Sequence, residues 1–125
     1  MKIKRFFTPQ EANKTLPLIK KIVEEILAKA KEYRELLEGL KDDEIPPECH
    51  HRKAEIDGLI DELQDLGCFY KDWNFEVGLV DFPSEIDGKQ VLLCWRSDEP
   101  ALQWFHSFED GYGGRQPIPE ELLNK

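Results

Sequence analysis

Apolar residues in the first half of the chain alternate at spacings of three and four, the pattern of a helix with one apolar stripe. The stripe runs through Leu16, Ile19, Val23, Ile26, Ala30, Tyr33, Leu37 and Leu40. This is a heptad seam, and charged residues occupy the other faces. Just before it, Thr8-Pro9-Gln10-Glu11 has the form of a capping box, so we expect the helix to start at Thr8. Pro17 should kink this helix or end a short first segment, with the main helix running from about Leu18 to Leu40.

A second stripe of the same kind follows between about Pro47 and Leu66. Gly67 comes directly after it and can adopt the left-handed conformation that ends a helix. A narrow seam on a long helix needs a helical partner, so the two helices should form an antiparallel hairpin over residues 8–66. Apolar side chains beside the seam should stay only partly covered and favour self-association; these are Leu18, Ile22, Leu27 and Ile60.

The hydrophobic period changes after Cys68. Residues 79–82, 90–95 and 102–108 read as three strands joined by the turn-rich segments SEIDGK and RSDEP, an antiparallel meander. CFYKDW at 68–73 is a short edge strand or a loop. VLLCW is apolar at every position, which favours a central strand covered on both faces. After DGYGG, a last amphipathic turn is expected at 120–123.

These elements predict an α+β fold and a single domain over residues 1–125. A long N-terminal antiparallel helical hairpin (8–66) packs on a small C-terminal antiparallel β-meander with a glycine-rich tail (68–125).

The turns also predict how the strands pair. A two-residue turn in SEIDGK sets Asp81 opposite Cys94. A four-residue loop in RSDEP sets Val91 opposite His106. Because paired residues share a face, His106 should lie on one face of the sheet and Cys94 on the other. A change of one residue in either loop would reverse a whole strand.

Charge and cysteine usage exclude several classes of protein. The chain has 17 basic and 26 acidic residues, a net charge of -9, and this field repels nucleic acids and anionic lipids. The sequence shows neither a membrane span nor a signal peptide, so we expect a cytoplasmic protein with no nucleic-acid or membrane partner. Cys49, Cys68 and Cys94 contain no CxxC pair, which indicates reduced thiols.

Cys94, His106 and Asp81 are the residue types of a nucleophilic triad. The predicted register separates Cys94 from His106, and a cysteine inside VLLCW is more often a small buried hydrophobe. We therefore do not expect this triad. Cys49-His50-His51 offers three metal-ligand types in a row, but neighbouring side chains on a helix point about 100° apart and cannot converge on one ion.

A candidate ligand or functional site lies instead at the rim of the predicted sheet. His106 follows two aromatic residues near a strand end, and flexible connections could bring Glu99 and Arg115 toward it. Simpler interpretations remain open: a His106 that bonds to the backbone at the rim of the sheet, and a DGYGGR segment that is only a tight irregular tail packed back on the sheet. The full candidate set is His106, Glu99, Arg115, Asp81, Trp95 and Trp104.

Asp81 sits between two apolar residues within a predicted strand and needs a partner, because a buried carboxylate left unpaired is costly. Arg96 or Arg115 would supply one as a structural ion pair.

Several stretches, in order, carry a family resemblance: FFTPQEANKTLPLI, GLVDFP, VLLCWRSDEPALQWFH and DGYGGRQPI. Together they resemble the uncharacterised bacterial family DUF2203. The positions that match by motif are Asp81, Cys94, Trp95, Glu99, Trp104, His106, Gly111, Gly114 and Arg115. The resemblance implies no activity.

Two functions follow as hypotheses. The first is a non-catalytic cytosolic interaction or ligand-binding module, without a cofactor, that forms a homodimer or homo-oligomer through its helical hairpin or docks a protein partner. The alternative is a small enzyme or metal-dependent ligand-binding protein with a divalent metal near His106, Glu99, Asp81 and Arg115. We expect the first, because the register leaves no nucleophile beside a base.

Overall fold

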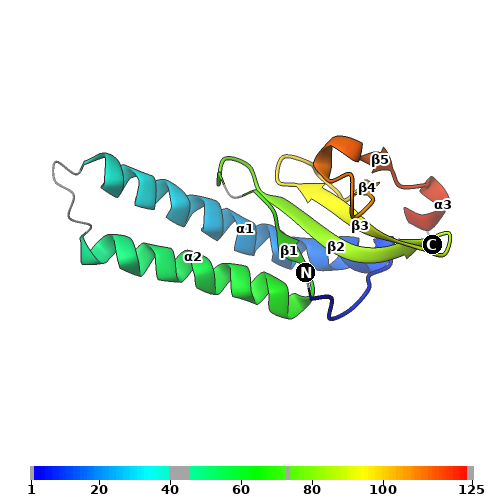
Figure 1. The fold of residues 1–125 in the computed structure, drawn as a ribbon, viewed down its shortest axis with the longest axis horizontal. Helices are drawn as coiled ribbons and strands as arrows, with labels where there is room; N and C mark the ends of the chain where they lie inside the picture. Colours follow the sequence, from blue (N-terminus) through cyan, green and yellow to red (C-terminus); the bar gives the residue numbers. More distant parts are fainter. Residues whose placement is uncertain (1, 40–45, 73, 124–125) are drawn as a thin grey trace.

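Two long helices lie side by side, and a five-stranded antiparallel sheet covers one end of the pair (Figure 1). The computed structural model describes residues 2–39, 46–72 and 74–123. Helix α1 spans Pro9–Glu38 and helix α2 spans Pro47–Leu66. The predicted α+β fold with an N-terminal helical hairpin is confirmed. Leu40 and Trp73, which belong to predicted elements, lie outside the described residues.

Helix α1 begins at the predicted capping box. The Thr8 hydroxyl accepts from the Glu11 backbone N–H at 3.1 Å, and the Thr8 N–H donates to the Glu11 carboxylate at 3.1 Å. Pro17 does not end a short first segment, because one continuous helix runs through it. Pro17 itself is exposed, while Leu16 and Ile19 beside it are buried. Packing of this buried face holds the helix together across the missing hydrogen bond.

Helix α2 begins at Pro47 and ends at Leu66 as predicted, with Gly67 in the left-handed conformation at φ 100°. Ion pairs join the two helices: Lys29 to Glu55 at 2.7 Å and Arg52 to Glu32 at 3.0 Å.

The expectation that the flanks of the hairpin stay partly covered holds for Leu18 and Leu27 and is wrong for Ile22 and Ile60. Ile22 and Ile60 are each only 6% exposed, and Leu27 packs partly buried against the core. Only Leu18 is well exposed, at 48%. Ile22 and Ile60 belong to the same hydrophobic core as the inner face of the sheet, so neither needs a second copy of the chain to cover it.

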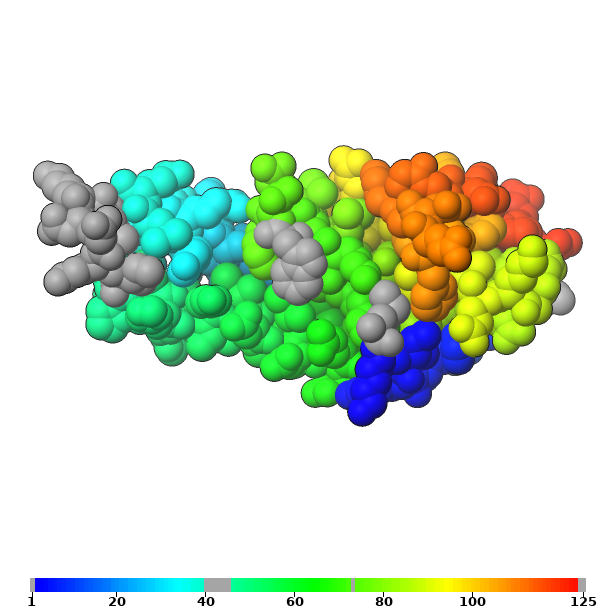
Figure 2. Space-filling model, viewed as in Figure 1, coloured from blue at the N-terminus to red at the C-terminus, as the bar shows by residue number. Residues whose placement is uncertain are grey.

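The strands follow one another in the sheet in sequence order, all antiparallel: β1 Phe69–Tyr70, β2 Leu79–Ile86, β3 Lys89–Arg96, β4 Trp104–His106 and β5 Gln116–Pro117. Strand β3 is central, and VLLCW is buried at all five positions, as predicted. The sequence did not predict β5. The chain between β4 and β5 contains a short 3₁₀ helix, Tyr112–Gly114, and a last helix, α3, spans Glu120–Leu123. In the space-filling view the segment around this 3₁₀ helix, in orange, lies on the surface of the molecule (Figure 2).

The first hairpin has the predicted register, with Asp81 opposite Cys94. Asp87 and Gly88 both have positive φ, 52° and 79°, as a tight two-residue hairpin turn requires.

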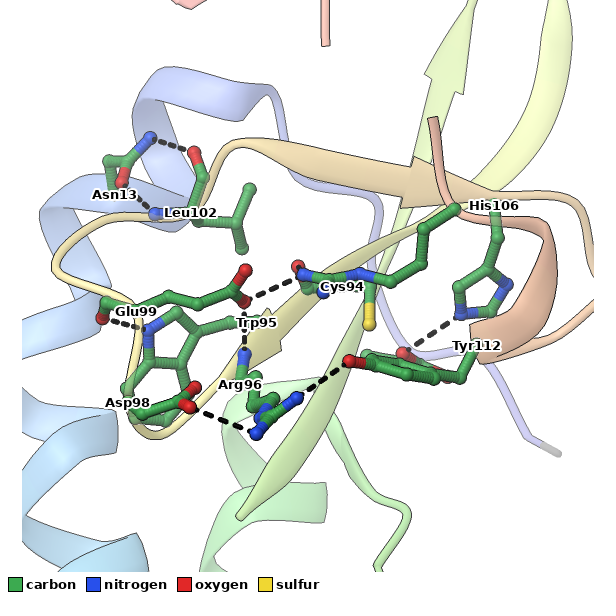
Figure 3. A network of polar contacts seen from close by, with 11 residues as sticks. Asn13, Cys94, Trp95, Arg96, Asp98, Glu99, Leu102, His106 and Tyr112 are labelled. Atoms are coloured by element: carbon green, nitrogen blue, oxygen red, sulfur yellow. Dashed lines mark hydrogen bonds and ion pairs between the residues drawn. The ribbon is translucent and has the colours of Figure 1, made fainter. Parts of the chain in front are cut away.

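The second register prediction is wrong by one residue, because His106 pairs with Leu92 and not with Val91. The reason is a contact made outside the sheet. The Leu102 N–H donates to the Asn13 side-chain oxygen at 2.9 Å, and the Asn13 amide donates to the Leu102 carbonyl at 3.1 Å (Figure 3). Helix α1 thus holds Leu102 where the meander predicted a strand, and β4 starts only at Trp104. Because of this shift of one residue, each side chain of β4 lies on the face of the sheet opposite to the predicted one.

Candidate metal centre

Three adjacent strands place Asp81, Cys94 and His106 on the outer face of the sheet. Asp81 on β2 lies directly opposite Cys94 on β3, and His106 on β4 lies opposite Leu92, two residues before Cys94. Such diagonal neighbours are within reach of long side chains. One potential ligand atom from each of the three residues lies within 4.8 Å of the other two. The residues are 4%, 1% and 3% exposed, so this is a buried cluster of one oxygen, one sulfur and one nitrogen donor.

The imidazole of His106 lies between two hydrogen-bond acceptors. Nδ1 is 2.8 Å from the Ser107 carbonyl oxygen, and Nε2 is 3.2 Å from Asp81 Oδ1. A neutral imidazole carries one N–H and can donate to only one of them. The contact at Nε2 therefore needs a proton, most simply a second proton on the ring, or another cation.

Without a metal, the second proton meets this requirement. Burial by itself disfavours a charged ring. Hydrogen bonds with Asp81, with Cys94 and with the Ser107 carbonyl, together with the negative charge of Asp81, outweigh burial and raise the pKa of His106 to about 10. The surroundings of Nε2 thus stabilise a positive charge.

The three donors also fit a transition metal. Zn²⁺ takes carboxylate oxygen, thiolate sulfur and imidazole nitrogen at bond lengths that set neighbouring ligand atoms roughly 3 to 4 Å apart. The three candidate ligand atoms lie within 4.8 Å of one another, so they would need to move only slightly closer together to bind one ion. A metal-ligating histidine usually donates its other N–H to a carbonyl or carboxylate, and here Nδ1 faces the Ser107 carbonyl. Three protein ligands would leave the fourth position of a tetrahedral ion open.

A pocket of about 270 Å³ adjoins all three candidate ligands. The residues that line it are Lys71, Leu79, Asp81, Leu92, Cys94, His106, Phe108, Gly111 and Tyr112. The tail after β4 supplies the last three residues, so this segment forms part of the pocket wall. A larger pocket of about 420 Å³ lies elsewhere, between the helices and residues 74–75. Its lining contains no candidate metal cluster found in the described ranges, so we assign the chemistry to the smaller pocket.

Glu99 and Arg115 do come together, but not at His106. Arg115 Nη2 donates to Glu99 Oε1 at 2.6 Å and to the Cys94 carbonyl oxygen at 3.2 Å. Its guanidinium lies 5.1 Å from the Trp104 ring centroid and 4.8 Å from that of Tyr112. These contacts tie the tail to the central strand directly behind the candidate ligand Cys94. Arg115 therefore positions the site.

The family model described as "Uncharacterized conserved protein (DUF2203)" matches residues 5–118, which confirms the resemblance seen in the sequence motifs. The chain belongs to the DUF2203 family. No curated protein and no solved structure matches this DUF2203 chain significantly. The candidate metal ligands and the Glu99–Arg115 pair all fall within the matched range. Within the described residues of the DUF2203 protein, no helix has the length and apolar character needed to cross a bilayer.

The DUF2203 site differs from the predicted one in three further ways. Asp81 pairs with His106, and the predicted partner Arg96 binds Asp98 at 3.0 Å. Trp95 is 1% exposed and packs in the core on the opposite face. Its indole N–H donates to the Glu99 carbonyl at 3.0 Å, so it supports the connection between β3 and β4. Trp95 does not line the pocket.

The third difference is that Cys94 and His106, which the predicted register separated, point to the same side of the DUF2203 sheet (Figure 3). The sequence did not predict Cys94 as a candidate ligand, although its predicted pairing with Asp81 is confirmed. The missing information was the Asn13–Leu102 contact, which joins residues 89 positions apart and leaves no local pattern.

Proposed function

We propose that this DUF2203 protein is a metal-dependent ligand-binding protein whose Asp81, Cys94 and His106 hold a divalent transition metal of the Zn²⁺ type. The observation that carries the proposal is the imidazole of His106, which has an acceptor at each ring nitrogen. A metal at Nε2 would satisfy the nitrogen lone pair, the Asp81 carboxylate and the Cys94 sulfur together. When bound, such an ion supplies a Lewis-acid position open to the pocket.

A nucleophilic triad uses the same residue types but fits this geometry less well. In that arrangement the carboxylate orients one imidazole nitrogen, and the other nitrogen takes the proton of the nucleophile. Here Ser107 occupies Nδ1, and the Asp81 carboxylate faces Nε2. Asp81 therefore competes with the Cys94 thiol for the nitrogen that a general base would use. A cation shared by the three side chains removes this conflict.

All three cysteines of the chain are free. Free thiols suit the reducing cytoplasm, and we include a cytoplasmic location in the proposal. Thiolates are also soft ligands, which favours zinc over magnesium or calcium at Cys94.

Metal analysis of protein purified without a histidine tag tests the proposal. After loading with Zn²⁺ and desalting, the wild-type protein should retain about one ion per chain, and Cys94→Ala should retain much less. Cys49→Ala is the matched control, because Cys49 is equally buried but lies at the start of α2, away from the sheet. Circular dichroism should show both variants folded. Zinc retention by Cys94→Ala equal to that of the wild type would refute the assignment.

Self-association through the helical hairpin stays a prediction. Of the four flank residues expected to form the contact, only Leu18 is well exposed, so a dimer through this surface would bury little apolar area. Sedimentation velocity at increasing protein concentration tests it. A single monomeric species throughout would exclude this mode of assembly.

A further inference from the structure

The pocket beside the candidate metal centre has a mostly apolar wall and a single cation. Leu79, Leu92, Phe108 and the ring of Tyr112 form the wall, and Lys71 is the basic residue in the lining.

The cation of Lys71 is not committed to a carboxylate. Its Nζ lies 6.0 Å from the Phe69 ring centroid, at the outer limit of a cation–π contact. In the part of the chain that the structure describes, no acidic side chain forms an ion pair with it. The two neighbouring arginines are already paired, Arg96 with Asp98 and Arg115 with Glu99. Lys71 is thus the basic group left for a ligand.

The charges around the pocket favour a ligand with one negative charge. A divalent ion held by the Asp81 carboxylate, the Cys94 thiolate and a neutral His106 gives a centre with no net charge. Lys71 adds one positive charge beside it. A monoanion balances this charge, while a doubly charged phosphate would bring an excess negative charge next to two anionic ligands.

The volume and the apolar wall of the pocket limit the size and polarity of the rest of the ligand. At about 270 Å³ it is slightly smaller than typical ligand pockets, which begin at about 300 Å³. Its aromatic and aliphatic wall suits a compact apolar body. A carboxylate could place one oxygen at the open metal position and accept a hydrogen bond from Lys71 with the other.

We propose that the pocket binds a small monocarboxylate with an apolar body, which the metal and Lys71 hold by its carboxylate. This inference rests on the proposed metal centre.

Titration of the cobalt-loaded full-length protein with benzoate tests the inference, because the visible spectrum of Co²⁺ responds to its ligands. At a pH where inorganic phosphate is doubly charged, benzoate should change the spectrum saturably, whereas neutral benzyl alcohol and phosphate should leave it unchanged at the same concentrations. Lys71→Met should weaken benzoate binding by about tenfold, the effect of losing one charge-assisted hydrogen bond. Lys21→Met, which removes an exposed lysine on α1, is the matched control and should bind benzoate like the wild type.

The outcomes separate the two proposals. Failure of the wild-type protein to bind cobalt would refute the metal centre, and the ligand inference with it. Cobalt binding without any response to benzoate would leave the metal centre standing and refute the carboxylate ligand. An equal response to benzyl alcohol or to phosphate would refute the charge argument. Unchanged benzoate affinity in Lys71→Met would refute the role of Lys71.

Discussion

Zinc should raise the thermal stability of this protein by an amount that can be calculated. A ligand that binds only the folded state stabilises it by about 2.7 kcal/mol when its free concentration is 100 times Kd. For a chain of 125 residues, each kcal/mol raises Tm by roughly 4 °C. We therefore expect Tm to rise by about 10 °C at this zinc concentration and to return to its starting value when EDTA is added.

The choice of variant decides whether the zinc-dependent rise in Tm can be attributed to the candidate metal centre. Replacing His106 would leave the buried carboxylate of Asp81 without its partner, at a cost of roughly 3 to 5 kcal/mol, and would confuse loss of metal with loss of folding. Cys94→Ala removes the sulfur ligand and keeps the Asp81–His106 pair. This variant should stay folded and lose the zinc-dependent shift.

The measurement is a circular dichroism melt in a reducing buffer, with and without zinc. Zinc can also bind to exposed histidines, and His50 and His51 are both exposed on α2. A variant with His50→Ala and His51→Ala together is therefore the control, and it should keep the full shift. The reasoning is refuted if Cys94→Ala retains the shift, or if the His50/His51 variant loses it.

Three further predictions concern stability. Arg115→Met should lower the free energy of unfolding by roughly 2 kcal/mol in urea titrations, because Glu99 loses its charged partner in a mostly buried position; an unchanged urea midpoint would contradict this. Burial raises the pKa of the Cys68 thiol from 9.0 to about 12. The neutral thiol therefore contributes its full stabilisation of the folded state below pH 9, and this contribution falls by about 1.4 kcal/mol per pH unit between pH 9 and about 12. The free energy of unfolding of Cys68→Ala should decline less steeply with pH over this range than that of the wild type. Equal slopes for the two proteins in urea titrations would refute this prediction. Gly78→Ala should cost roughly 1 to 3 kcal/mol by the same assay, because the new methyl group meets the Val23 side chain, and wild-type stability would show that the packing adjusts freely.

The sequence by itself determined the local elements. The heptad stripe and the Thr8 capping box determined where α1 starts and which face it buries, and Gly67 marked the end of α2. Asp87 and Gly88 determined the register of the first hairpin, because a two-residue turn leaves the strands only one pairing. Each of these signals acts between residues that are close along the chain.

Tertiary structure decided the site. Whether His106 shares a face with Cys94 depends on one residue of register in the second hairpin. The loop before β4 is long enough to allow either register, and the contact of Leu102 with Asn13 on α1 selects the observed one. Packing also overrode the helix-breaking tendency of Pro17. A local sequence pattern carries no information about contacts between distant segments, so only the folded chain shows that Asp81, Cys94 and His106 lie close together.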